Sequence, residues 1–182
     1  MRIVGGALGG RVLRAPPGHS TRPTSEKVRE AIFNILPDVD GARVLDIFAG
    51  SGALGIEALS RGAAHASFVD FDKTALKVLR GNLSDLGLEG RAQVIAQEAV
   101  AAVRRAPEAP WRFVFVDPPY ASDLATRAVL ALPRASLAED VWIVIEHDRR
   151  HAPPDALGDL LRNDQRRYGD TLVSFYGLPH DP

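Results

Sequence analysis

The chain has 182 residues, of which 46% are hydrophobic and 25% are charged, values that are ordinary for one globular domain with a full-sized core. It contains no cysteine, which excludes disulfide bonds and thiolate metal sites, and its five histidines are too scattered to predict a metal site. The net charge is −1, and no apolar stretch is long enough for a signal peptide or a membrane span, so we expect a cytoplasmic protein.

The N-terminal segment is predicted to be a basic appendage, residues 1–36, on a core that spans residues 37–182. Glycines separate two short runs, residues 2–4 and 11–14, and this pattern predicts a β-hairpin. Residues 1–35 carry a net charge of +4, which leaves −5 for the rest of the chain. The asymmetry indicates a polyanionic partner, although a solvated charged face would give the same pattern.

A helix is expected after the hairpin, because Thr24 or Ser25 can cap its first turn. Apolar residues then recur at helical spacing until Pro37, which cannot continue a helix. The residues that share this apolar face are Val28, Ala31, Ile32, Ile35 and Leu36.

Beyond residue 37, strand-like and helix-like periods alternate, which predicts an α/β fold. Strands are expected at residues 43–48, 66–70, 92–96, 111–116 and 141–147, and a terminal hairpin at 165–168 and 171–176. Helices are expected at 52–61, around Leu76 to Leu86, and near 98–105, 124–132 and 155–161. Because the first five strands are apolar on both faces, they should form a parallel sheet covered by helices on both sides, as in Rossmann-like domains.

A glycine-rich loop follows the first of these strands. Residues 50–55 match G-x-G-x-x-G and open a helix, as a dinucleotide-binding loop would. Asp46, at the end of the strand, would repel a pyrophosphate but attract a cation. S-adenosylmethionine carries a sulfonium and an ammonium group and no phosphate, so the loop favours this cofactor. A purely structural role for Asp46, as a cap of the turn, is the alternative.

Acidic residues also follow the next two strands. Asp70 ends the second strand, where a carboxylate can accept both hydroxyls of a ribose. Asp72 is expected to cap the helix that follows. Glu98, after the third strand, could accept the amino group of adenine, or it could start its own helix, where the dipole favours an acid.

The fourth strand ends in Asp117-Pro118-Pro119-Tyr120. Asp117 and the carbonyl of Pro118 can accept both hydrogens of a planar amino group, which turns the nitrogen lone pair toward a methyl donor. Proline fixes the backbone and removes competing donors, and Tyr120 can stack on a flipped base. Positioning and electrostatics would then provide the rate. Taken alone, the motif could also be a strand-ending turn.

These motifs resemble the RsmD-type bacterial 16S rRNA guanine-N(2)-methyltransferases. The resemblance rests on residues 44–63, on the motif at 117–120, on the N-terminal runs 2–6, 10–11, 22–24 and 28–36, and on residues 168–176. It implies a class I methyltransferase sheet of seven strands, the last antiparallel, in a single domain. It also implies methyl transfer from S-adenosylmethionine to the 2-amino group of a guanine in small ribosomal subunit particles.

The resemblance further implies a role for each motif residue, in a protein expected to be monomeric. The cofactor would contact Thr24, Asp46, Phe48, Ala49, Gly50, Ser51, Gly52, Asp70, Phe71, Glu98, Ala99 and Asp117. The target base would contact Asp117, Pro118, Pro119 and Tyr120. The RNA would contact Arg2, Arg11, Arg22, Arg29 and Asn34. Glu98 departs from the aspartate that is usual in the family.

Three other functions compete with this interpretation. A DNA amino-methyltransferase would share the motif at 117–120, but the chain leaves little room for a separate target-recognition domain. A nicotinamide-dependent oxidoreductase would use the glycine loop, but Asp46 and the lack of an evident acid/base pair count against it. A non-catalytic RNA-binding module would not need an intact motif at 117–120.

Overall fold

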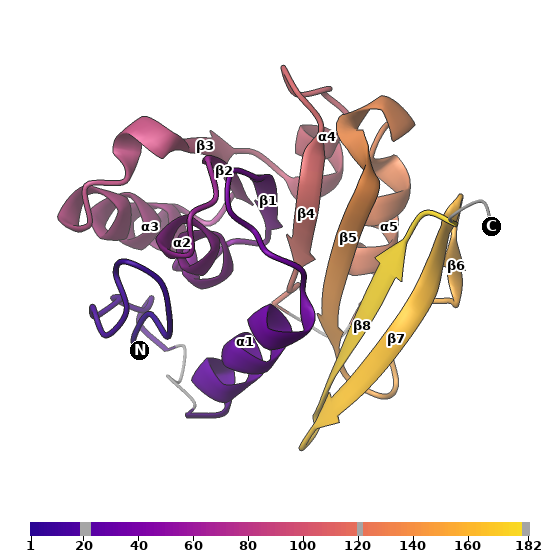
Figure 1. The fold of residues 1–182 in the computed structure, drawn as a ribbon, viewed down its shortest axis with the longest axis horizontal. Helices are drawn as coiled ribbons and strands as arrows, with labels where there is room; N and C mark the ends of the chain where they lie inside the picture. Colours follow the sequence, from indigo (N-terminus) through magenta and orange to yellow (C-terminus); the bar gives the residue numbers. More distant parts are fainter. Residues whose placement is uncertain (19–22, 120–121, 180–182) are drawn as a thin grey trace.

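The computed structural model describes residues 1–18, 23–119 and 122–179, which form one mixed sheet between two layers of helices (Figure 1). The strands are β1 (Arg43–Ile47), β2 (His65–Asp70), β3 (Ala92–Ala96), β4 (Trp111–Val116), β5 (Leu137–His147), β6 (Ala156–Leu157), β7 (Leu160–Tyr168) and β8 (Thr171–Gly177). Their order is β3-β2-β1-β4-β5-β8-β7-β6. Strands β1 to β5 run parallel and β8 is antiparallel to β5, which confirms the expected α/β class.

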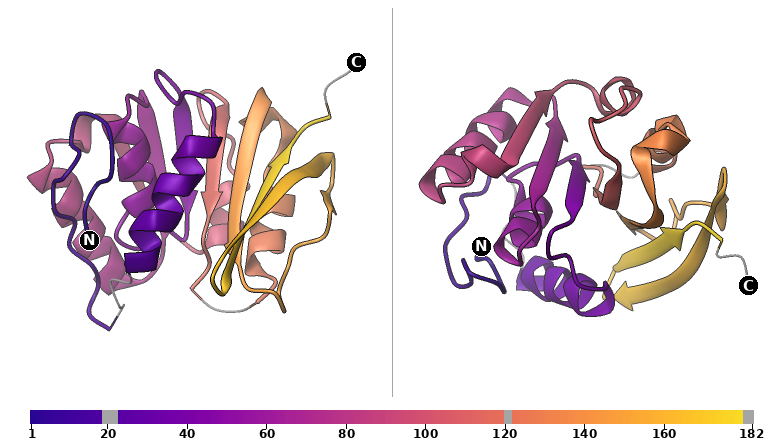
Figure 2. Two further views of the ribbon diagram at one scale, coloured as in Figure 1. Left: turned by 60° about the horizontal axis from the view of Figure 1, so that its bottom comes forward. Right: turned by 45° about the horizontal axis from the view of Figure 1, so that its top comes forward.

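The helices divide between the two faces of the sheet because neighbouring strand residues point to opposite sides. Val44 packs in the cluster that contains residues of α1 (Pro23–Ile35), α2 (Ala53–Ser60) and α3 (Lys73–Asp85). Leu45 packs in the cluster that contains residues of α4 (Ala99–Val103) and α5 (Leu124–Ala131). Figure 2 shows the two layers. In the described part of the chain, no helix is long and apolar enough to cross a membrane.

Two sequence predictions about the C-terminal third were wrong. A helix was expected at 155–161, but these residues form β6, a tight turn and the start of β7, and the sheet has eight strands rather than seven. The pairing of Leu157 with Leu160 leaves Gly158 and Asp159 as a two-residue hairpin loop, with φ 61° at Gly158. Glycine followed by aspartate is a hairpin signal, and it outweighed the helical spacing of the leucines.

The N-terminal segment contains less sheet than expected. A single bridge joins Arg2 and Val12 in place of a regular hairpin, and the loop between them packs against α2. Glu57 of α2, which is fully buried, holds this segment by accepting hydrogen bonds from the backbone N–H groups of Val4 and Gly5 at 2.9 and 2.8 Å. The segment is therefore a fixed part of the domain surface.

Candidate active site

A cavity of about 540 Å³ lies at the carboxyl ends of β1, β2, β4 and β5. Its position is the usual ligand site of an open α/β sheet, and its size is typical of small-molecule sites. Most of the residues predicted to contact cofactor or base line it. They are Asp46, Phe48, Ala49, Gly50, Ser51, Asp70, Phe71, Asp117, Pro118 and Pro119.

Three carboxylates reach the cavity from the sheet face that α1, α2 and α3 cover. Asp46 of β1 pairs with Phe115 of β4, whose ring packs in the cluster on that face. Asp117 lies two residues after Phe115, so its side chain leaves the strand on the same side. Glu146 of β5 follows Ile145, the partner of Val116, and is therefore level with Asp117.

On the first side of the cavity, Asp46 and a fourth carboxylate, that of Asp70, hold the glycine loop, and we call this the glycine-loop side (Asp46, Asp70 and residues 48–55). Asp46 Oδ2 accepts a hydrogen bond from Gly55 N at 2.9 Å. Asp70 Oδ2 accepts from Gly50 N at 2.9 Å, and its Oδ1 accepts from Asp72 N at 2.9 Å. Asp72 in turn caps α3 through Ala75 N at 2.8 Å, as predicted.

The loop itself has an unusual backbone. Phe48 lies in the left-handed region with φ 62°, a conformation that costs a non-glycine residue free energy and is common at functional sites. Gly52 has φ 84°, and a Cβ there would lie 2.4 Å from Leu79 Cδ1, so only glycine fits. Gly50, at φ 57°, faces open space instead, where a ligand can approach its backbone.

On the second side, which we call the β4–β5 side (Asp117 and Glu146), the carboxylates have no such partners. Within the described ranges, no protein donor forms a hydrogen bond with the carboxylate of Asp117 or Glu146, although both line the cavity. Asp117 is an exposed residue of the cavity wall, and partial desolvation by the neighbouring protein raises its pKa from 3.8 to about 6.

The other two carboxylates are also harder to ionise than usual. Burial raises the pKa of Asp46 well above its ordinary value, and the charge of Asp117 adds to the effect. The hydrogen bond from Gly55 opposes it. Burial likewise raises the pKa of Glu146, followed by the charge of Asp117, and the cation of Arg29 acts in the opposite direction. The cavity therefore favours a positively charged ligand over an anion.

The structure corrects the expected role of Arg29. This residue was expected to face RNA, but it is only 3% exposed and lines the cavity from α1. Its Nε donates to Glu57 Oε2 at 3.2 Å, and its Nη2 donates to the carbonyl of Arg2. The segment that packs over α1 covers it, which a count of charges along the chain cannot reveal. Arg2, Arg11 and Asn34 are exposed, as an RNA contact requires.

Glu98 and Ala99 are absent from the residues that line the cavity. Both oxygens of Glu98 cap α4, accepting from Val100 N at 3.1 Å and Ala101 N at 3.0 Å. The sequence left two roles open for Glu98, a contact to adenine and the start of a helix, and the structure shows the second. Gly52 is buried and is also absent from the residues that line the cavity. Tyr120 and Arg22 lie outside the described residues, as does the side chain of Thr24.

Glu146 is the residue of the site that sequence reasoning missed. A usable signal exists, because Asp46, Asp70 and Asp117 are also acids at the end of buried strands, and Glu146 stands one residue before the end of β5. The relation to Asp117 becomes visible only when the register of β4 and β5 is known.

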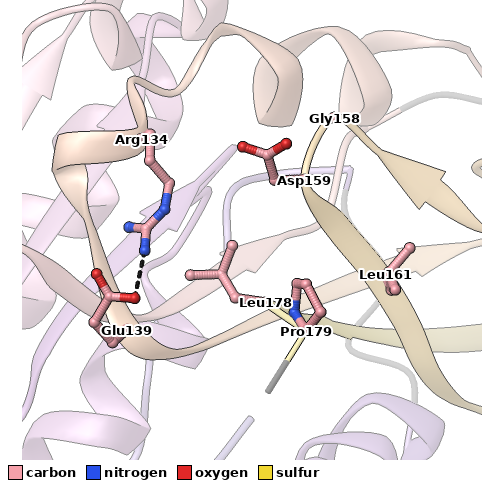
Figure 3. A pocket seen from close by; sticks show the side chains of 7 residues that line it. All are labelled: Arg134, Glu139, Gly158, Asp159, Leu161, Leu178 and Pro179. Carbon is pink, nitrogen blue, oxygen red and sulfur yellow. Dashed lines mark hydrogen bonds and ion pairs between the residues drawn. The ribbon is translucent and has the colours of Figure 1, made fainter. Parts of the chain in front are cut away.

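A second depression, of about 380 Å³, lies beside the β6–β7 turn and the amino-terminal half of β5 (Figure 3). It is lined by Gly158 and Asp159 of the β6–β7 turn, by Leu178 and by an ion pair between Arg134 and Glu139 at 2.6 Å. Glu139 belongs to the amino-terminal half of β5, whereas Glu146 is near its carboxyl end. None of the predicted site residues lines this depression.

The sequence matches the family described as conserved hypothetical protein 95 over residues 1–177. It is 46% identical over 181 residues to YlbH of Bacillus subtilis (strain 168), a protein provisionally named as an rRNA methyltransferase, with 97% of this chain and 98% of the relative covered. It is 38% identical over 178 residues to ribosomal RNA small subunit methyltransferase D of Escherichia coli (strain K12), with 97% and 89% covered.

A solved structure of yhhF from Escherichia coli, provisionally described as a methyltransferase, has the same fold. It superimposes with a TM-score of 0.85 at 32% identity and covers 100% of this chain and 99% of that chain. A structure of a hypothetical protein from Thermus thermophilus gives a TM-score of 0.79 at 28% identity, with 98% and 99% covered.

Proposed function

The chain belongs to the conserved hypothetical protein 95 family, the RsmD family, and on this basis we propose that it methylates RNA of the small ribosomal subunit at the 2-amino group of a guanine. One observation carries the chemistry. Asp117, an acceptor without a protein donor in the described residues, stands beside a glycine loop that Asp46 and Asp70 hold open.

The residues of the glycine-loop side fit S-adenosylmethionine. The carboxylates of Asp46 and Asp70 line the cavity on this side, and the cation of Arg29 is already engaged by Glu57, which suits a ligand with positive groups and no phosphate. Asp70 lines the cavity together with Phe71, a residue that is 66% exposed and whose ring can stack on an adenine. When bound, this cofactor supplies a methyl group on a cationic sulfur.

On the β4–β5 side, Asp117 would accept one hydrogen of the target amino group and the carbonyl of Pro118 the other. Both acceptors weaken the conjugation of the nitrogen lone pair with the ring and point it toward the methyl group. As the nitrogen gains the methyl group it loses a proton, and Asp117, already hydrogen-bonded to the amino group, is placed to receive it. Orientation and electrostatics supply the rate.

Exposed basic residues of the N-terminal segment would bind the RNA backbone. Arg11 is exposed, and its Nη2 donates to the Asp85 carbonyl at 3.2 Å, which directs the guanidinium along the surface beside α3. The variant Arg11→Gln should lower the slope of log K against log salt by about one unit. An unchanged slope in fluorescence titrations would remove Arg11 from the RNA interface.

The test of the function uses small ribosomal subunits from cells that lack the enzyme. The purified protein and tritiated S-adenosylmethionine should label their 16S rRNA, and nucleoside mass spectrometry should identify N2-methylguanosine. Large subunits and duplex DNA are the control substrates. Labelled DNA would favour the competing DNA methyltransferase, and a labelled adenine or cytosine in rRNA would contradict the choice of base.

A further inference from the structure

We propose that Glu146 selects guanine as the target base by accepting a hydrogen bond from its ring N1–H while Asp117 accepts from the 2-amino group. The inference rests on the proposed function and names the residue that gives it base specificity. The motif at 117–120 grips an amino group, which guanine, adenine and cytosine all possess. A second contact is needed to distinguish among them.

The sheet places Glu146 where such a contact is made. Val116 pairs with Ile145 in the parallel register of β4 and β5, so the next residues, Asp117 and Glu146, lie side by side on adjacent strands. Adjacent strands are about 4.8 Å apart, a spacing that two acceptors can bridge to neighbouring atoms of one base. Both side chains line the same cavity.

The Glu146 carboxylate is also available to a ligand. Burial raises the pKa of Glu146, and the charge of Arg29 opposes this shift. The Arg29 guanidinium is nevertheless engaged elsewhere, because its Nε donates to Glu57 at 3.2 Å and its Nη2 donates to the carbonyl of Arg2. Across the residues that the structure describes, no donor is hydrogen-bonded to Glu146. Glu146 is half-buried, and a partly desolvated carboxylate without a donor is costly, so a base that supplies an N–H group stabilises it.

Guanine is the base whose amino group has a ring donor beside it. Its N1–H and 2-amino group present adjacent donors, whereas the ring nitrogen next to the amino group of adenine or cytosine is an acceptor. In its ionised form, which the cation of Arg29 favours, the Glu146 carboxylate attracts the first arrangement and repels the lone pair of the second. The pair formed by Asp117 and Glu146 therefore complements one edge of one base.

The test compares guanine with 2-aminopurine, which keeps the 2-amino group but has an acceptor at N1. Small subunits are reassembled from 16S rRNA that carries either base at the mapped position, and initial methylation rates are measured with the wild-type protein and with Glu146→Gln. We expect the wild type to methylate guanine about 100-fold faster than 2-aminopurine, within the range of a well-placed pair of base contacts. In Glu146→Gln this rate ratio should fall by at least tenfold. Glutamine can donate as well as accept, so it tolerates either ring nitrogen.

The matched control is Glu139→Gln, which changes an exposed glutamate near the amino-terminal end of the same strand and should retain the wild-type preference. Thermal unfolding of both variants shows whether Glu146→Gln remains folded, and the ratio of the two rates does not depend on the folded fraction. If Glu146→Gln and the wild type prefer guanine over 2-aminopurine by the same factor, the role of Glu146 is overturned and the proposed function is not. If the wild type forms no N2-methylguanosine, the proposed function fails and the inference with it.

Discussion

The glycine-loop side and the β4–β5 side of the cavity use the same residue types in different ways. Asp46 and Asp70 accept hydrogen bonds from backbone amides, so their carboxylates hold the loop as well as face the ligand. Asp117 and Glu146 have no hydrogen-bond donor among the described residues. The first pair contributes hydrogen bonds to the fold, whereas we propose that the second pair binds the substrate.

This difference explains how the functional groups on each side of the cavity are held in position. The glycine-loop side is preorganised by its own hydrogen bonds, which suits a cofactor that binds in the same way in every reaction cycle. The β4–β5 side is positioned by strand register and by two prolines, and under the proposed function its acceptors obtain hydrogen-bond donors from the target base. Substitutions should therefore separate stability from catalysis.

The largest effect is expected for Asp117→Asn. Asparagine is a weaker, neutral acceptor and cannot receive the proton, so methyl transfer should slow by about 100- to 1000-fold, the usual cost of removing one preorganised group from a reacting centre. Cofactor affinity should change little, because Asp117 makes no hydrogen bond to the glycine loop. Single-turnover rates and calorimetry measure the two quantities, with Asp159→Asn, in the β6–β7 turn, as the control. A loss of affinity as large as the loss of rate would contradict the division between the two sides.

On the glycine-loop side, Asp46→Asn should weaken cofactor binding by about 10- to 100-fold, since a hydrogen bond or contact to a charged group is worth about 1.5–3 kcal/mol. Asparagine keeps an acceptor oxygen for Gly55 N, so the free energy of unfolding should change little. Asp46→Ala removes that acceptor as well and should lower the free energy of unfolding by about 1–3 kcal/mol. Equal stability losses in the two variants, measured by urea denaturation, would show that the hydrogen bond is not what Asp46 contributes to folding.

Asp70→Ala and Asp117→Ala compare the two sides of the cavity through the free energy of unfolding. The first variant deprives Gly50 N and Asp72 N of their acceptor, and we expect a loss of about 1–2 kcal/mol in the free energy of unfolding. Asp117→Ala should leave the free energy of unfolding unchanged or raise it, since it removes a desolvated carboxylate that has no partner. If both variants lose the same stability, Asp117 has a structural partner and the comparison fails.

The sequence was sufficient to predict the parts of the molecule that local chemistry controls. The parallel strands were visible as apolar runs, and Asp46, Asp70 and Asp117 as acids that end them. Residues 155–161 were misjudged because a two-residue turn at Gly158 and Asp159 overrides the spacing of the flanking leucines.

Properties that depend on tertiary packing could not be predicted from the sequence. The charge of Arg29 predicts an exposed side chain, but the N-terminal segment covers it and Glu57 neutralises it. Only the register of β4 and β5 shows that Glu146 lies beside Asp117. The spacing between Asp117 and Glu146 in the sequence says nothing about their proximity.

The smallest effect is the pH dependence that Asp117 should give to stability. Its pKa is about 6 in the folded protein and 3.8 ordinarily, so the folded state binds the proton more tightly than the unfolded state. Stability should therefore decrease as pH rises from about 4 to 6 and level off above that range. Asp117→Asn should remove this part of the slope, measured as the difference between the two proteins in urea denaturation at each pH. A difference that does not change across this range would mean that the Asp117 carboxylate is solvated like an ordinary surface acid, and the β4–β5 side would then lack the desolvated acceptor on which the contrast depends.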